Sequence, residues 1–260
     1  MHLIDTHCHI DLPIFKDDYQ EILTTSRQAG ISAMILPGVC QSGWQHLLEL
    51  CGHEADLFPA IGLHPMYLQH HRQQHVEELA AHIDAAPLVA LGEIGLDYFI
   101  EGVSHSKQQE LFEIQLDLAH KAKLPVLLHV RKAHDQALAT LRRRHFPHGG
   151  IVHAFNGSRQ QAEQYRGLGF KLSFCGTITY DRAKNIRRLA TALDLKDIVI
   201  ETDSPDMPPA SQHGERNIPA NLPDVVQTIA ELRGVPAEVI ATATTKNARE
   251  VLNLPRGTNP

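Results

Sequence analysis

The sequence predicts a (β/α)8, or TIM, barrel, and two features of the chain support this expectation. First, short apolar runs of strand length alternate with stretches of helical periodicity, which is the pattern of repeated βαβ units. Second, side chains that commonly bind metals follow several of these runs, and the carboxyl ends of all strands of a barrel open onto one face. A barrel therefore explains how residues from distant segments can form one site.

Eight apolar runs are candidates for the strands, each about as long as a buried strand. In chain order they cover residues 3–5, 33–36, 58–62, 88–92, 126–129, 151–153, 171–174 and 198–201. Seven helices are expected between them, over residues 18–29, 43–51, 76–85, 106–122, 133–144, 160–168 and 184–193. A doubly wound open sheet is the alternative, but such sheets usually have fewer strands and gather ligands at a switch point.

A proline-rich loop over residues 204–223 follows the last predicted strand. It leads to two further helical stretches, 224–232 and 237–252, which we interpret as a C-terminal helical extension. No internal repeat or change of composition marks a second domain, and α/β barrels of this length are routinely one domain. We therefore expect residues 1–260 to form a single (β/α)8 domain.

Composition and charge narrow the class of protein. The chain has 260 residues, of which 43% are hydrophobic, and a net charge of −6, as is ordinary for a soluble globular protein. It shows neither a leader peptide nor an apolar run of about 18 residues, so we expect a cytoplasmic protein without membrane contact. Four scattered cysteines favour reduced thiols over disulfides. Nothing in the pattern indicates an obligate protein partner.

The strongest functional signal is a set of histidines and carboxylates at the ends of the apolar runs. His7 and His9 follow the first run, where the segment from Leu3 to His9 reads as a short strand, and because residues two apart in a strand share a face, one metal ion can bind both. The pair alone is a weak signal in a chain with 18 histidines. Four later runs strengthen it, because each ends in a possible ligand: Glu93, His129, His153 and Asp203.

These residue types suit a site with two divalent ions. A carboxylate can donate one oxygen to each of two ions, whereas a neutral imidazole has one lone pair to give, so Glu93 is the natural bridge. Asp203, at the last strand, is placed to orient an attacking water or to accept its proton. Glu93 and Asp203 are thus the candidate catalytic residues. The histidines suit Zn, Mn or Fe, while nucleases often use Mg, so the ion remains open.

Short motifs surround these ligands and continue beyond them. They are Asp5-Thr6-His7-Cys8-His9, Gly62-Leu63-His64-Pro65, Gly92-Glu93-Ile94-Gly95-Leu96-Asp97, His153-Ala154-Phe155-Asn156-Gly157 and Glu201-Thr202-Asp203-Ser204-Pro205. They resemble the TatD-type metal-dependent deoxyribonucleases, a branch of the amidohydrolase superfamily, and the likeness runs from Ile4 to about Leu252. The resemblance implies a barrel, a two-metal site and hydrolysis of phosphodiester bonds in DNA.

The resemblance also divides the ligands between two ions. In the family's arrangement, the first ion takes His7, His9, Glu93 and Asp203. The second takes Glu93, His129 and His153. Asp5 shares the strand face of His7 and His9, and we expect it to support a ligand by accepting a ring N–H.

Substrate contacts are expected from segments that follow strands, because these lie on the open face of a barrel. His64 ends the third strand and is a candidate for contacting phosphate. Arg131 follows the fifth strand, and Tyr180 and Arg182 follow the seventh. Tyr180 or Phe155 is a candidate for stacking an unpaired base. The acidic net charge gives no global support for nucleic-acid binding, so a local patch must carry it.

Because a barrel mouth suits a single strand or a frayed end better than an intact duplex, we expect exonuclease-like action on DNA. Four positions depart from the family pattern. Asp206 and Met207 replace an aromatic and an aliphatic residue, Met66 replaces a common histidine, and Asn156 replaces a serine. These departures leave the six ligands unchanged but alter the substrate pocket. The alternative function is therefore hydrolysis of a small amide, lactone or nucleotide at the same two metals. A metal-containing binding protein is disfavoured, because it has no need of an open two-metal site.

Overall fold

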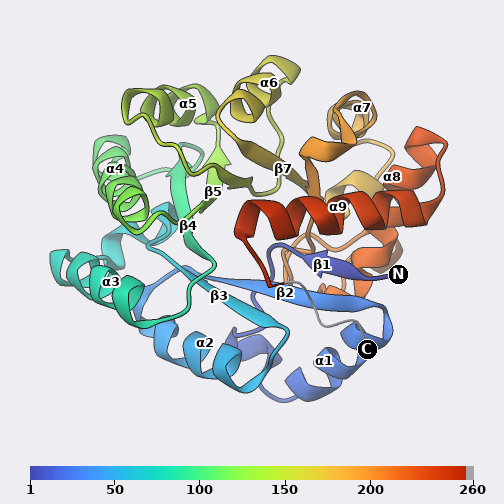
Figure 1. The fold of residues 1–260 in the computed structure, drawn as a ribbon, viewed down its shortest axis with the longest axis horizontal. Helices are drawn as coiled ribbons and strands as arrows, with labels where there is room; N and C mark the ends of the chain where they lie inside the picture. The colour runs from blue at the N-terminus through green and yellow to red at the C-terminus, as the bar shows by residue number, and fades with distance from the viewer. Residues whose placement is uncertain (256–260) are drawn as a thin grey trace.

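In the computed structural model, which describes residues 1–255, eight parallel strands follow one another around a barrel (Figure 1). The strands are β1 (Leu3–Asp5), β2 (Ile31–Gly38), β3 (Leu57–Ile61), β4 (Ala90–Asp97), β5 (Val126–Arg131), β6 (Gly150–Val152), β7 (Phe170–Phe174) and β8 (Ile198–Ile200). Just beyond their ends, β1 and β8 are joined by a hydrogen bond from the Thr6 amide to the Ile200 carbonyl (3.1 Å). The predicted (β/α)8 barrel is confirmed.

Helices surround the barrel and close one of its ends. They are α1 (Tyr19–Gln28), α2 (Gln41–His53), α3 (Gln73–Ala85), α4 (His105–Ala122), α5 (His134–Arg143), α6 (Arg159–Gly167), α7 (Lys184–Ala192), α8 (Leu222–Arg233) and α9 (Ala237–Leu252). Each begins and ends within three residues of its predicted bounds. Within residues 1–255, none of these helices has the length and apolar character needed to cross a membrane.

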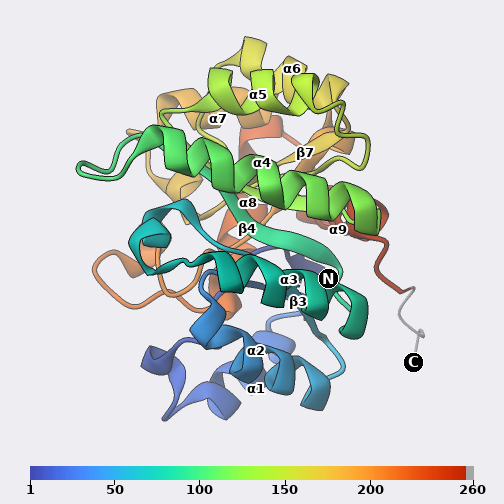
Figure 2. The same cartoon turned by 90° about the vertical axis from the view of Figure 1, so that its left-hand side faces the viewer.

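One end of the barrel is filled by an apolar cluster and covered by α9, which lies across it in Figure 1. Ala248 and Leu252 of α9 pack against inward-facing side chains of seven strands: Ile4, Ala33, Ile35, Ala60, Ala90, Leu127, Ile151 and Val199. In Figure 2 the green loop that leads into α4 and the orange loop after β8 project from the end opposite α9. The loops that follow these strands therefore lie at the end of the barrel that α9 does not cover.

The two strands that carry Glu93 and His129 extend further at their carboxyl ends than predicted, and this changes how these ligands are held. β4 continues to Asp97 and β5 to Arg131, so the predicted ends at residues 92 and 129 are wrong. Glu93 thus lies inside β4, where the pairing with β5 shifts between Leu91 and Ile94. Such a bulge re-aims a side chain within a strand.

A glycine in β4 permits this continuation. Gly95 has a φ of +143°, and a Cβ built on it would lie 2.0 Å from the carbonyl oxygen of His129 on β5. Only glycine allows the two backbones to approach so closely, because it carries no Cβ. The pair of strands therefore stays in contact beyond the two ligands, as far as Asp97 and Arg131.

Candidate active site

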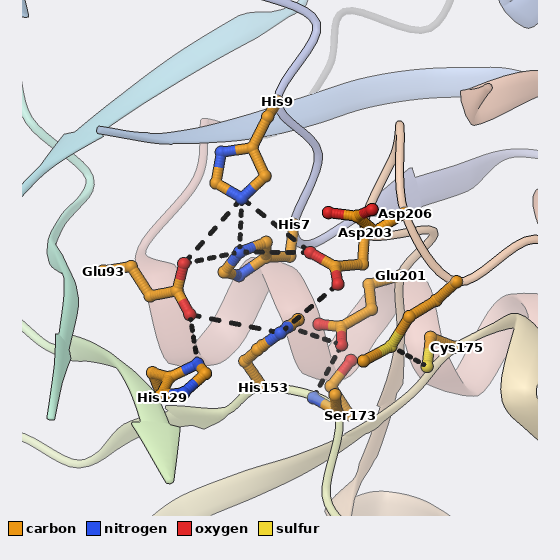
Figure 3. A network of polar contacts seen from close by, with 12 residues as sticks. His7, His9, Glu93, His129, His153, Ser173, Cys175, Glu201, Asp203 and Asp206 are labelled. Atoms are coloured by element: carbon orange, nitrogen blue, oxygen red, sulfur yellow. Dashed lines mark hydrogen bonds and ion pairs between the residues drawn. The ribbon is translucent and has the colours of Figure 1, made fainter. Parts of the chain in front are cut away.

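The six predicted ligands come together at the carboxyl end of the barrel (Figure 3). The alternation of strand side chains explains the position of two of them. Leu127 and Ile151 point into the barrel interior, and His129 and His153 follow two positions later on the same face. His7 and His9 lie beyond the end of β1, with their Nε2 atoms 3.2 Å apart.

Glu93 stands between two groups of histidines. Its Oε2 atom lies 3.2 Å from His7 Nε2 and 3.8 Å from His9 Nε2. Its Oε1 atom lies 3.0 Å from His129 Nδ1, 3.2 Å from His64 Nε2 and 4.0 Å from His153 Nε2. The two oxygens of one buried carboxylate therefore face different imidazoles, which is the arrangement that a bridging ligand requires.

Asp203 approaches both groups from the opposite side. Its Oδ1 atom lies 3.7 Å from His7 Nε2 and 3.8 Å from His9 Nε2, and its Oδ2 atom lies 3.7 Å from His153 Nε2. The Asp203 amide donates to the His7 carbonyl at 2.9 Å, which fixes the chain after β8 against the chain after β1. The carboxylate thus faces the same space as Glu93 (Figure 3).

The donor set fits divalent metal ions. Three sets of donors have ligand atoms within 4.8 Å of one another: His7 with His153 and Asp203, His7 with His9 and Glu93, and His64 with Glu93 and His129. Imidazole and carboxylate together suit Zn, Mn or Fe. The sets overlap, and they include His64, which was expected to contact the substrate. His64 is buried, and its Nδ1 accepts the Met66 amide at 3.1 Å.

Burial and neighbouring groups set the protonation of the site. Burial, aided by His7, lowers the pKa of His9 to about 3, and burial also lowers the pKa of His64 to about 4. Burial alone would raise the pKa of Glu93, but His64 and His7 hold it well below its usual value. Burial raises the pKa of Asp203 to about 6. Near neutral pH, His9 and His64 therefore offer lone pairs, and both carboxylates are ionised.

Two carboxylates behind the ligands were not assigned a role from the sequence. Asp97 Oδ2 lies 2.9 Å from His129 Nε2, and Glu201 Oε1 lies 2.8 Å from His153 Nδ1. Both carboxylates are buried, and each contacts the ring nitrogen that faces away from Glu93. Carboxylates in such positions orient metal-binding histidines and raise their basicity. The available signal was the spacing of Glu201, two residues before Asp203 at a strand end.

Asp5 makes a different contact from the one expected. It accepts hydrogen bonds from the Thr202 amide (2.9 Å), the Thr202 hydroxyl (2.5 Å) and the His7 backbone amide (3.2 Å). Nδ1 of His7 is buried and, within residues 1–255, has no hydrogen-bond partner. The expected bond to a ring N–H is therefore absent, because Asp5 instead joins the chain after β1 to the chain after β8. Burial raises the pKa of Asp5 to about 7.

The predicted substrate contacts have different surroundings. Arg131 is exposed at the end of β5. Tyr180 is half-buried, its hydroxyl donates to the Pro208 carbonyl at 3.2 Å, and the guanidinium carbon of Arg182 lies 5.2 Å from its ring centroid. Phe155 is only 1% exposed, so the prediction that its ring could stack a base is wrong. It packs edge to face against His134 and Tyr165.

Comparisons with known proteins identify the family of the chain. A family model described as TatD related DNase matches residues 4–253. The uncharacterized metal-dependent hydrolase YjjV of Escherichia coli K12 is 40% identical over 97% of this chain and 98% of its own length. The crystal structure of YjjV, described as a TatD homolog, superposes with a TM-score of 0.94 over 97% of this chain and 98% of that one.

More distant relatives cover almost the whole chain as well. An uncharacterized metal-dependent hydrolase of Haemophilus influenzae is 34% identical over 97% of this chain and 100% of its own length. A TatD family hydrolase from Entamoeba histolytica shares the fold, with a TM-score of 0.84 at 19% identity over 96% of this chain and 98% of that one. The chain therefore belongs to the TatD family, and it is a metal-dependent hydrolase.

Proposed function

We propose that this hydrolase cleaves phosphodiester bonds in DNA and removes nucleotides from single strands or frayed ends, using two divalent ions. The observation that carries the proposal is the position of Glu93, whose Oε2 faces His7 at 3.2 Å while its Oε1 faces His129 at 3.0 Å. One carboxylate shared between two sets of ligands favours a pair of ions over a single one. The description of the matching family model, which names a DNase, supports the substrate class.

The residues divide the work of hydrolysis between them. Bound divalent ions supply an acidified water and positive charge for the phosphoryl oxygens and the leaving alkoxide. Asp203 faces the same space and accepts the proton of the attacking water, as a general base must lie within reach of it. Glu93 sets the separation of the two halves of the site. His64, buried and with its pKa lowered to about 4, stays neutral beside the Glu93 carboxylate.

The position of the site restricts the form of the substrate. The ligands are nearly all buried, with His7, Glu93 and His153 between 1% and 6% exposed. A phosphodiester that reaches them must leave the surface of a duplex and enter the barrel mouth. An unpaired strand or a frayed end can do this at lower cost, because its bases are free of partners.

The test uses metal-stripped protein with end-labelled single-stranded and duplex DNA, to which Mg, Mn or Zn is added back. Asp203→Asn, nearly the same size but without the acidic group, is the matched variant. We expect metal-dependent, progressive shortening of the single strand that disappears in the variant. If the protein binds metal stoichiometrically but cleaves neither substrate with any of the three ions, the proposal is contradicted.

One observation favours a second candidate, a hydrolase of a small amide, lactone or nucleotide. Asp206 is exposed and lies beside Asp203 in Figure 3, with its amide donating to the Asp203 carbonyl at 2.8 Å. A carboxylate near the mouth repels a phosphate backbone that approaches from this side. If DNA is the substrate, Asp206→Asn should increase the rate of DNA cleavage. Metal-dependent turnover of small esters, without cleavage of DNA, would support the second candidate.

A further inference from the structure

An exposed aromatic ring with two cations over it lies at the carboxyl end of β4. Phe99 is 47% exposed, whereas most large apolar side chains of the described residues are buried. The guanidinium carbon of Arg131 lies 3.8 Å from the ring centroid of Phe99, and Lys132 Nζ lies 4.6 Å from it. Both cations are themselves exposed. This arrangement presents an apolar surface and positive charge at the same place.

The ring is attached directly to the metal-binding region. Asp97 Oδ1 accepts the backbone amide of Phe99 at 2.9 Å, while Asp97 Oδ2 contacts His129 Nε2 at 2.9 Å. One buried carboxylate therefore holds both the backbone of Phe99 and a ligand. The backbone adds a second link, because the Tyr98 amide donates to the Arg131 carbonyl at 2.9 Å. The backbone that carries Phe99 and Arg131 is consequently tied to the site.

The charge around the mouth is uneven. Arg131 and Lys132 lie on the side formed by β4 and β5, and Asp206 lies on the side formed by β8. An anionic strand is attracted to the first side and repelled from the second, and local charges of this kind guide a ligand even when the net charge is −6. A polyanion that enters the site should therefore lie over Phe99.

We propose that Phe99, Arg131 and Lys132 form a platform that binds one unpaired nucleotide of the substrate strand. The base stacks on the surface made by the Phe99 ring and the Arg131 guanidinium, and Lys132 contacts a phosphate. Aromatic rings and guanidinium planes accept any base in this way, so the platform recognises single-stranded nucleic acid without reading its sequence. The inference rests on the proposed function, since it names the form of DNA that the site takes.

Binding measurements can test the platform separately from cleavage. The protein is metal-loaded and carries Asp203→Asn to slow hydrolysis, and fluorescence anisotropy follows two labelled oligonucleotides of about ten nucleotides, within the site size of single-strand binders. One carries bases and the other is abasic, with the same phosphates. The variants are Phe99→Leu, which keeps an apolar side chain, and Phe99→Trp, which keeps a stacking surface. Val239→Ala, at an apolar side chain that is 45% exposed on α9, is the matched control.

We expect Phe99→Leu to weaken binding of the base-bearing oligonucleotide by about 5- to 150-fold, the range for loss of one stacked base, and to leave the abasic one unchanged. Phe99→Trp should restore binding, and Arg131→Gln with Lys132→Gln should weaken binding of both oligonucleotides. Equal effects on both oligonucleotides, no effect of Phe99→Leu, or no binding of either would overturn the platform.

The same measurements separate this inference from the proposed function. Base-dependent binding through Phe99 in a protein whose parent form cleaves no DNA would support the platform and contradict the nuclease. Cleavage of single strands together with unchanged binding in Phe99→Leu would support the nuclease and contradict the platform.

Discussion

The two pairs of histidines that the family resemblance assigns to separate ions, His7 with His9 and His129 with His153, have different surroundings. His129 and His153 each have a buried carboxylate, Asp97 or Glu201, against the ring nitrogen that faces away from Glu93. His7 and His9 have no such support, because among residues 1–255 their ion pairs all involve Nε2 and the carboxylates of Glu93 and Asp203. The four histidines are therefore held in two ways, two with a carboxylate behind the ring and two without.

This difference changes the proton affinity of the two pairs. Burial lowers the pKa of His9 to about 3, with further lowering by His7. Burial alone would lower the pKa of His153 too, but Glu201 and Asp203 hold it well above its usual value, and Asp97 and Glu93 likewise raise that of His129. A carboxylate behind an imidazole thus decides whether burial leaves it neutral or charged. We call His129 and His153 the supported pair. Near neutral pH, once it is deprotonated, this pair should bind its ion more tightly than His7 and His9.

The largest effect is expected from Glu93→Gln, which removes the carboxylate that both pairs share. We expect the rate of hydrolysis to fall on the order of 10³-fold or more. Bound ions stabilise the transition state by several kcal/mol, and each ~1.4 kcal/mol changes the rate tenfold. Metal analysis should show that both pairs lose affinity. Two tightly bound ions and a rate within tenfold of the parent protein would show that Glu93 is not shared.

A smaller and selective effect is expected from Glu201→Gln and Asp97→Asn. Each should weaken metal binding at the supported pair by about 10- to 100-fold, the usual cost of removing a partner behind a ligand, and leave the His7 and His9 pair unchanged. Titration with Mn, followed by its magnetic resonance signal, measures the two affinities. Glu163→Gln, at an exposed carboxylate on α6, is the control. Equal weakening at both pairs would remove the distinction between them.

The smallest expected effect is on the number of protons released when metal binds. In the metal-free protein the pKa of His153 lies well above its usual value and that of His129 is also raised, so metal binding must displace protons from this pair, above all the one on His153. The affinity of this pair should therefore increase with pH as its histidines deprotonate. His9, with a pKa of about 3, is already neutral and should release nothing.

Calorimetry in two buffers of different ionisation enthalpy counts the released protons. Glu201→Gln should lower the count, because His153 loses the carboxylate that keeps it protonated. An unchanged count would mean that Glu201 does not set the protonation of His153.

The barrel and the six converging ligands could be predicted from the sequence, because a ligand at the end of a strand can be recognised from the apolar run that precedes it. The support behind the ligands was harder to predict. Two glycines within residues 92–95 made β4 look finished at Gly92, yet the bulge carries the strand on to Asp97. Asp97 thus looked like a loop residue rather than a partner of His129.

The substrate surface was predicted least well. Phe155 and Phe99 both follow strands, but one is buried against His134 and Tyr165 while the other is exposed beneath Arg131. Exposure at a loop depends on how neighbouring loops pack, and no local pattern records it. Periodicity predicts which face of a strand is inside, but it does not predict which aromatic side chain after a strand stays accessible.

The most direct test of two ions bridged by one carboxylate is electron paramagnetic resonance of the protein titrated with Mn. Two Mn ions that shared Glu93 would lie about 3.5–4 Å apart and would couple magnetically. We predict that the spectrum of isolated Mn appears up to one equivalent and is replaced by a coupled spectrum by the second, and that Glu93→Gln abolishes the coupling. An uncoupled spectrum at two equivalents, or saturation at one, would contradict the account.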